Sequence, residues 1–308
     1  IAGNLPSAPV LVGNVTLWKP ASSAVYPCHF IMQMLKEAGL PDGVINFIPG
    51  SGGKVGDPVL KNENLAGVHY TGSTETFQHI WKTIGTKIDQ YKTYPRIVGE
   101  TGGKDFCLAH VSADIDELAT AMIRGAFEFQ GQKCSAMSRA YIPETIWEEL
   151  KDKYLTELET VTVGSPRDFT NFMNAVIDKP AFDSITQYID YTKNADETEI
   201  ISGGNYDDSI GYYIQPTTIL TSDPYFKTMK EEIFGPVLTI YLYDPADWDS
   251  TIDLVDSTSQ YGLTGCIMGK DKEAMAQARD RLTHSAGNIY INDKPTGAVA
   301  VSYTHLTL

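Results

Sequence analysis

The sequence of 308 residues has few cysteines, a deficit of positive charge and no long apolar stretch, and each absence excludes a class of protein. Four cysteines without close pairing are too few for a disulfide scaffold and lack the spacing of a zinc knuckle, so we expect a reduced, intracellular protein without a metal site. No uninterrupted apolar run approaches the roughly 18–20 residues that a membrane span needs. The formal net charge of −15 argues against nucleic acid and anionic membranes as partners.

The first hundred residues alternate strand-like and helix-like patterns. This order predicts a parallel, doubly wound α/β sheet with ligand sites at the carboxyl ends of its strands. The expected strands cover residues 15–18, 44–48, 65–70 and 96–99. We expect Ser22 or Ser23 to cap the helix after the first strand, and Gly39 to end it. The apolar face of this helix is expected to include Val25, Phe30, Met34 and Leu35.

A second unit is expected to begin near Gly102. Asp114 and Glu117 resemble a capping box, and an apolar helical pattern follows as far as Phe127. This helix should stop around Gly131. Short strands alternate with helices from there to about residue 291, so the second unit is also α/β.

Cys134 and Glu100 are the residues whose surroundings point to chemistry. Cys134 stands among small and polar residues, in Gln-Gly-Gln-Lys-Cys-Ser, whereas Cys28, Cys107 and Cys266 lie in apolar patterns and are expected to be structural. Glu100 is followed after one residue by a flexible Gly-Gly-Lys. A cysteine can supply a thiolate and a glutamate a base. Together they indicate covalent catalysis on an electrophilic carbon.

Two glycine-containing turns could approach a phosphate. Residues 50–56, Gly-Ser-Gly-Gly-Lys-Val-Gly, lack the Ser or Thr that follows the lysine of a P-loop and have the wrong glycine spacing, which excludes phosphoryl transfer. The other turn joins a strand to a helix, so its N–H groups can meet a pyrophosphate at the positive end of the helix dipole, or simply cap the helix, or do both. It contains Gly72, Ser73, Thr74, Glu75 and Thr76.

The chain resembles the aldehyde dehydrogenase superfamily and, more narrowly, the L-glutamate gamma-semialdehyde dehydrogenases (1-pyrroline-5-carboxylate dehydrogenases). The matching segments are residues 3–9, 17–21, 70–73, 231–237 and 288–294, with the Glu100 and Cys134 motifs. They occur in the order of the family and cover about residues 1–299. The resemblance implies a Rossmann-type parallel-sheet cofactor domain followed by an α/β catalytic domain.

By this resemblance, residues 1–101 are the C-terminal part of an NAD-binding domain, residues 102–299 are the catalytic domain and residues 300–308 are a tail foreign to the family. We therefore expect an internal fragment of a longer protein. The family takes one donor to the oxyanion from an asparagine upstream of residue 1, and Asn4 is not that residue. The fragment itself is expected to be an impaired enzyme.

The resemblance also implies a role for single residues. Cys134 would be the nucleophile and Glu100 the base, with NAD as cofactor. Lys19 would contact the adenine-side ribose, Glu232 the nicotinamide ribose, and Phe234 would pack near the nicotinamide ring. The residues implied for substrate binding are Lys133, Ser135, Gly297 and Ala298.

The implied function is NAD-dependent oxidation of L-glutamate gamma-semialdehyde to L-glutamate in proline degradation, through a cysteine thiohemiacetal and thioester. Ser22 and Ser23 stand where many relatives carry a glutamate that contacts the ribose diol, so NADP stays open. The alternatives are a dehydrogenase for another small semialdehyde and a truncated, non-catalytic relative that binds nucleotide. The full-length parent is expected to form a homo-oligomer, in the cytoplasm of a bacterium or the mitochondrial matrix of a eukaryote.

Overall fold

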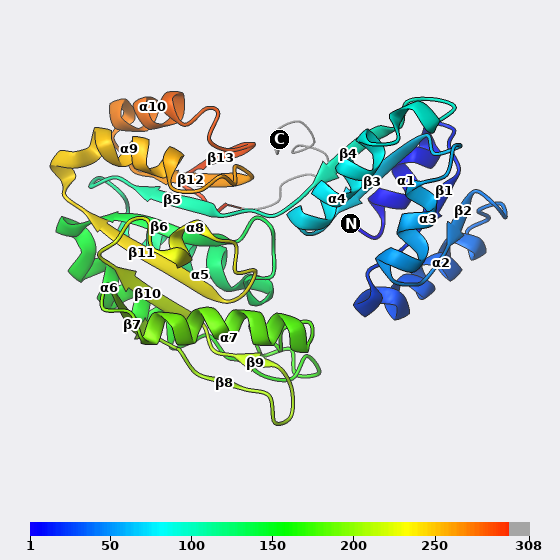
Figure 1. Ribbon diagram of the computed structural model, residues 1–308. Helices are drawn as coiled ribbons and strands as arrows, with labels where there is room; N and C mark the ends of the chain where they lie inside the picture. Colours follow the sequence, from blue (N-terminus) through cyan, green and yellow to red (C-terminus); the bar gives the residue numbers. More distant parts are fainter. Residues whose placement is uncertain (296–308) are drawn as a thin grey trace. The chain divides into compact units, whose positions relative to one another are not determined.

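The structure is a computed structural model that describes residues 1–295. The chain divides into two compact units, one that ends at Thr101 and one that begins at Gly102 (Figure 1). Both are α/β, as the sequence predicts. None of the helices described combines the length and the apolar character that crossing a bilayer requires.

The first unit builds two pairs of parallel strands, β1 with β2 and β3 with β4. Its elements are α1 (Asn4–Leu11), β1 (Thr16–Trp18), η1 (Ser22–Ala24), α2 (Val25–Glu37), β2 (Ile45–Phe47), η2 (Gly52–Gly56), α3 (Asp57–Leu60), β3 (Gly67–Thr71), α4 (Thr74–Gly85), η3 (Ile88–Gln90) and β4 (Arg96–Glu100). All four expected strands are present. They form two separate ladders rather than one sheet, because no strand within residues 1–295 pairs with a member of each.

The start of α2 differs from the sequence prediction. Ser22 and Ser23 lie in the short turn η1, and Ala24 occupies the N-cap position without a side-chain hydrogen bond. The predicted apolar face is wrong for Phe30 and Met34, which are exposed, whereas Leu35 packs on the core as predicted; Cys28 and Met32 are the buried residues of this helix. Residues two positions apart in the sequence lie about 200° apart around a helix. The pair Cys28 and Met32 and the pair Phe30 and Met34 therefore lie on opposite sides of α2.

The second unit is built on one sheet with the order β13-β12-β5-β6-β11-β10-β7, in which all neighbours are parallel except β7 and β10. Its elements are β5 (Asp105–Ala109), α5 (Ile115–Phe127), η4 (Glu128–Gly131), β6 (Met137–Pro143), α6 (Glu144–Leu158), α7 (Lys179–Lys193), β7 (Thr198–Ser202), β8 (Tyr206–Asp207), β9 (Tyr213–Ile214), β10 (Thr217–Thr221), α8 (Lys227–Lys230), β11 (Val237–Tyr243), η5 (Pro245–Asp247), α9 (Trp248–Ser257), β12 (Thr264–Met268), α10 (Lys272–Arg281) and β13 (Asn288–Ile291). The side chain of Asp114 caps α5, as predicted.

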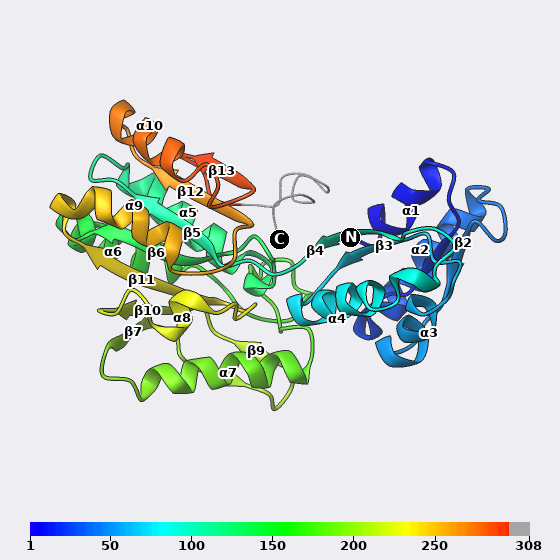
Figure 2. The ribbon, with the colours of Figure 1, turned by 45° about the horizontal axis from the view of Figure 1, so that its top comes forward.

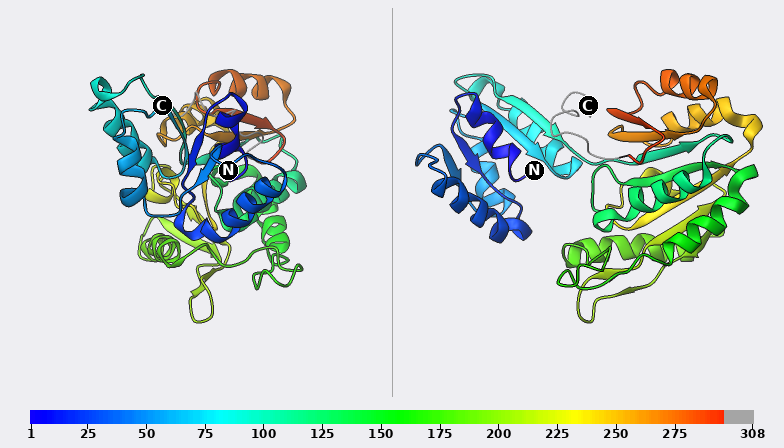
Figure 3. Two further views of the ribbon diagram at one scale, coloured as in Figure 1. Left: turned by 90° about the vertical axis from the view of Figure 1, so that its right-hand side faces the viewer. Right: turned by 180° about the vertical axis from the view of Figure 1, so that it is seen from behind.

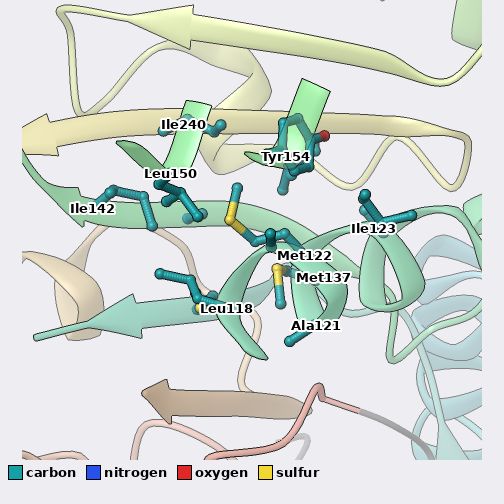
Figure 4. Close-up of a cluster of buried hydrophobic side chains, with 14 of the residues drawn as sticks. Leu118, Ala121, Met122, Ile123, Met137, Ile142, Leu150, Tyr154 and Ile240 are labelled. Atoms are coloured by element: carbon teal, nitrogen blue, oxygen red, sulfur yellow. The ribbon is translucent and has the colours of Figure 1, made fainter. Parts of the chain in front are cut away.

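Helices cover both faces of this sheet. Side chains alternate along β5, so Cys107 packs under α5 and α6 while Phe106 and Leu108 pack under α8, α9 and α10 (Figures 1 and 3). Figure 4 shows the α5 and α6 layer, where Leu118 and Leu150 gather with side chains of the central strands. Near β7, α7 packs its buried face on β10 and the neighbouring loops (Figure 2). Both faces are closed, so ligands can reach the sheet only at its strand ends.

Candidate active site

Cys134 lies in the loop between η4 and β6, at the amino end of a central strand. It is partly exposed, whereas Cys28, Cys107 and Cys266 are buried, as predicted. Ser135, the next residue, is buried with an exposed fraction of 3%. The one cysteine that the sequence singled out is therefore the accessible one.

The approach to Cys134 is held in an unusual backbone conformation. Phe129, Gln130 and Gly131 have φ angles of 56°, 60° and 62°. Left-handed φ at a residue other than glycine costs about 1–3 kcal/mol, so neighbouring contacts must support it. The buried side chain of Gln130 supplies them: its amide donates to the carbonyl of Ala175 at 3.3 Å and accepts from the N–H of Asn174 at 3.1 Å. The loop is thus fixed before any ligand arrives.

Gly102 and Gly103 form the contact between the nucleophile loop and the loop that carries Glu232. A Cβ atom on Gly103 would lie 2.0 Å from the carbonyl oxygen of Cys134, and one on Gly102 would lie 2.1 Å from Oε2 of Glu232. The N–H of Gly103 also donates to Oε1 of Glu232 at 2.9 Å. A side chain at either glycine would displace one of these groups, which explains why Glu100 and Thr101 are followed by two glycines.

The loop of Glu232 also touches the nucleophile loop directly. A Cβ on Gly131 would lie 2.3 Å from the carbonyl oxygen of Gly235. Phe234, which directly precedes Gly235 in this loop, has a φ of 55° and is exposed. Burial raises the pKa of Glu232, and its hydrogen bond from Gly103 and the charge of Lys104 oppose the rise. The loop of Glu232 and the loop of Cys134 thus meet at Gly235 and Gly131, and both lie against the Gly102–Gly103 segment.

Beneath the two glycines lie buried charges that the sequence analysis missed. Lys104 and Asp105 are each about 1% exposed, and Nζ of Lys104 and Oδ2 of Asp105 have no hydrogen-bond partner among the described residues. Oδ1 of Asp105 accepts from the N–H and hydroxyl of Thr264, and Nε of Arg139 donates to the carbonyl of Lys104 at 2.8 Å. Burial lowers the pKa of Lys104 to about 7 and raises that of Asp105 to about 7. The signal in the sequence was a Lys-Asp pair directly before an apolar run.

Lys133 forms an ion pair with the carboxylate of Glu128. Its Nζ lies 2.8 Å from Oε2 of Glu128, which also receives Lys294 at 3.3 Å. Of the other predicted substrate residues, Ser135 is buried, and Gly297 and Ala298 lie outside the described residues, as does the tail at residues 300–308.

The residues expected to hold a cofactor in the first unit lie at the carboxyl ends of its strands. Lys19 follows β1, and its Nζ donates to the carbonyl of Pro20 at 2.9 Å. Gly72 follows β3, and its N–H donates to the carbonyl of Glu100 at 3.2 Å, which ties the ends of β3 and β4 together. A Cβ on Gly72 would lie 2.3 Å from the hydroxyl of Tyr70, so a larger residue there would have to displace the end of that side chain.

The turn before α4 caps that helix. The side chain of Ser73 accepts from the N–H of Thr76 at 3.3 Å. Oγ of Thr74 is buried and has no hydrogen-bond partner among residues 1–295. Gly72, Ser73, Glu75 and Thr76 are exposed. Glu100 ends β4 in the first unit and Cys134 lies in the second, so the pairing of these two side chains stays a prediction of the sequence.

The fold agrees with comparisons to known proteins. The model of the aldehyde dehydrogenase family matches residues 4–304, and the chain belongs to that family.

Within this family, the chain is 50% identical over 298 residues to the mitochondrial delta-1-pyrroline-5-carboxylate dehydrogenase of Dictyostelium discoideum. This match covers 96% of this chain and 53% of that protein. It is 45% identical to the enzyme of that name from Bos taurus, with 97% and 53% covered. The chain thus spans about half the length of the relatives it matches.

Solved structures give the same result. The delta-pyrroline-5-carboxylate dehydrogenase of Mycobacterium tuberculosis bound with NAD superimposes with a TM-score of 0.92 at 46% identity, over 97% of this chain and 55% of that one. The 1-pyrroline-5-carboxylate dehydrogenase from Thermus with bound NAD gives a TM-score of 0.88 at 32% identity, over 96% and 56%. The predicted family and fold class are therefore confirmed.

Gly103→Ala tests the contact between the glycine pair and the nucleophile loop. Because backbone rather than a flexible side chain meets the new methyl group, we expect a loss of stability of about 1–3 kcal/mol. The rate at which iodoacetamide alkylates Cys134 should change as well. Gly85→Ala is the control, since a Cβ there meets open space. Equal melting temperatures and equal alkylation rates for the two variants would contradict the proposed contact.

Asp105→Asn tests the buried carboxyl. The ordinary pKa of 3.8 applies to the unfolded chain, and burial raises the folded value to about 7. Between these values the unfolded chain has lost the proton that the folded protein keeps, so this group lowers the free energy of unfolding as the pH rises. In urea titrations at pH 5 and pH 7, Asp105→Asn should gain stability relative to wild type at the higher pH. The exposed Asp152→Asn should not, and a parallel response of both would refute the assignment.

Proposed function

We propose that the protein carrying this chain oxidises L-glutamate gamma-semialdehyde to L-glutamate with NAD as hydride acceptor, in proline degradation. The main support is the Gly102–Gly103 segment, against which both the Glu232 carboxylate and the Cys134 backbone lie. The Glu232 carboxylate, which can hold a nucleotide, and the candidate nucleophile Cys134 thus lie against the same short stretch of backbone. The relatives described above bear the name of this activity.

The first half of the proposed reaction takes place at Cys134. Its thiolate attacks the aldehyde carbon, so a C–S bond forms and the carbonyl electron pair moves onto oxygen. The backbone N–H of Cys134 is one donor available to that oxyanion. Bound NAD would accept a hydride from the same carbon as the C=O bond re-forms, which leaves a thioester on Cys134.

The second half needs a base, and we assign it to Glu100. Its carboxylate removes a proton from water, the resulting oxygen nucleophile attacks the thioester, and the Cys134 thiolate leaves as the acid is released. Glu100 stands three residues before Gly103 in the chain. Even a fully extended backbone therefore keeps their Cα atoms within about 11 Å.

The residues of the first unit have the chemistry that a dinucleotide requires. The exposed Gly72 and Ser73 precede the 12-residue helix α4, whose amino end favours a pyrophosphate. Thr74, Glu75 and Thr76 complete this turn, and the hydroxyl of Thr74 has no hydrogen-bond partner among the described residues. We assign Lys19 to the adenine-side ribose.

Two residues of the second unit would hold the other end of the cofactor. The Glu232 carboxylate would accept from the nicotinamide ribose, and Phe234 would pack near the nicotinamide ring. Phe234 has a φ of 55° and an exposed side chain.

The substrate side is assigned to Lys133, Ser135, Gly297 and Ala298. An ammonium group beside the nucleophile suits an aldehyde that carries a carboxylate at its far end. We further propose that the full-length protein forms a homo-oligomer and works in the cytoplasm of a bacterium or the mitochondrial matrix of a eukaryote.

Glu100→Gln should separate the two halves of the reaction. In the full reading frame that contains this chain, we expect a burst of NADH followed by turnover reduced about 100-fold or more, because thioester hydrolysis has lost its base. Mass spectrometry should find the acyl adduct on Cys134. Cys134→Ala is the control and should give neither burst nor adduct. Full turnover in either variant would disprove the assigned role.

A substrate panel tests the assignment to glutamate gamma-semialdehyde. We expect kcat/KM with NAD to be highest for this aldehyde and at least about tenfold lower for succinic semialdehyde and unsubstituted aliphatic aldehydes, since these lack groups the site would bind. Equal use of an aldehyde without the amino acid head would favour the alternative of another small semialdehyde. No turnover of any aldehyde, with nucleotide still bound, would favour the non-catalytic alternative.

A further inference from the structure

Three cations converge on the carboxylate of Glu128, and one of them, Lys133, directly precedes Cys134 in the chain. Oε1 of Glu128 receives Nε and Nη2 of Arg124 at 2.7 and 2.6 Å, and Oε2 receives Lys133 at 2.8 Å and Lys294 at 3.3 Å. These four residues are called the Glu128 cluster below. Both oxygens of the carboxylate are therefore occupied, each by a charged donor.

The members of the Glu128 cluster come from three separate parts of the second unit. Arg124 lies in the last turn of α5, Glu128 opens η4, Lys133 directly precedes Cys134, and Lys294 follows β13. Lys294 lies against α5, because a Cβ on Gly125 would be in van der Waals contact with Cβ of Lys294 at 3.4 Å. Glu128 thus joins the two ends of the nucleophile loop to each other and to the segment that leads toward residue 296.

The cluster keeps a surplus of positive charge. Burial disfavours ionisation of Glu128, but hydrogen bonds from Lys133 and Arg124 and the charges of Lys133 and Lys294 outweigh it and hold its pKa at about 2. The carboxylate is ionised at neutral pH and balances only one of its three cations. The side chains of Lys133 and Lys294 are only 30% and 19% exposed, so water screens this surplus less than it would on an open surface.

We propose that Glu128 is a positioning residue that holds the ammonium groups of Lys133 and Lys294 beside Cys134, and that this arrangement gives the nucleophile its preference for electrophiles that carry an anionic group. The part that concerns the natural substrate rests on the proposed function. The part that concerns Cys134 and small electrophiles does not.

A different role for Glu128 would give the opposite result. If Glu128 acted only as a negative charge near Cys134, its neutralisation would strengthen the attraction of anions to Cys134. If Glu128 holds the lysines in place, neutralisation releases two flexible, strongly hydrated side chains toward solvent, and the attraction weakens. The direction of the change therefore decides between the two.

Alkylation of Cys134 measures the effect without the enzymatic reaction. Iodoacetate and iodoacetamide react with the same thiolate and differ by one negative charge, and the other three cysteines are buried. In wild type the ratio of the two alkylation rates, iodoacetate over iodoacetamide, should exceed that of a free thiol and should fall with added salt. Glu128→Gln should lower the ratio about fivefold or more, and Glu128→Asp, which keeps the charge, should recover part of it.

Asp183→Asn is the matched control, because Asp183 also accepts an i, i+4 ion pair, from Lys179 in α7, and none of the four residues of the Glu128 cluster pairs with it. Its ratio should equal that of wild type. A ratio that rises in Glu128→Gln, or that stays unchanged there, overturns the proposal. A wild-type ratio equal to that of a free thiol at low salt overturns it without any variant.

Steady-state kinetics in the full reading frame then separate this inference from the proposed function. Glu128→Gln should raise KM for glutamate gamma-semialdehyde about tenfold, with kcat and the KM for an uncharged aldehyde changed less than about threefold. A wild type that oxidises neither aldehyde refutes the proposed function and leaves the alkylation result standing. A wild type that prefers the anionic aldehyde, with a variant that loses both aldehydes equally, refutes only the positioning role.

Discussion

The close approach of Gly102 and Gly103 to two other loops is the constraint on which the rest of the candidate site depends. Their backbone occupies the space in which any side chain would overlap the Glu232 carboxylate or the Cys134 carbonyl. The contact between Gly103 and the Cys134 carbonyl is main chain against main chain, so it fixes the starts of β5 and β6 relative to each other. The Glu232 carboxylate is held there by its side chain, which lies against Gly102 and accepts a hydrogen bond from the N–H of Gly103.

Two ionisable side chains, Lys104 and Asp105, are buried next to the Gly102–Gly103 segment, and their burial costs free energy. Lys104 and Asp105 each leave a polar atom without a hydrogen-bond partner among the described residues, and isolated buried charges are expensive. Hydrogen bonds from Thr264 to Asp105 and from Arg139 to the Lys104 carbonyl offset part of that cost. They also tie β12 and β6 to the start of β5. The same groups that destabilise the core thus immobilise the backbone against which the nucleophile rests.

The features that the sequence predicted depend on residues close together in the chain, and the features that it missed depend on residues far apart in the chain. Strand and helix alternation, the Asp114 cap and the loop position of Cys134 could be predicted because each depends on neighbours in the chain. The left-handed backbone of Gln130 depends on residues 174–175, and the Glu128 cluster depends on Lys294. The prediction that Ser22 or Ser23 caps the helix failed because α2 begins one or two residues later, after η1, with Ala24 at the N-cap, and because Cys28 and Met32 pack against β1 and β2.

The two units place their chemistry at opposite ends of strands, and this explains the excess of cations. In the first unit Lys19, Gly72 and Glu100 lie at carboxyl ends, where the amino ends of following helices favour anions. In the second unit Cys134 precedes its strand and lies just past the carboxyl end of α5, where helix dipoles repel anions. An anionic substrate could not bind at this edge on backbone dipoles alone. Arg124, Lys133 and Lys294 reverse the sign of the local field, and Glu128 is the single anion that keeps three mutually repelling cations together.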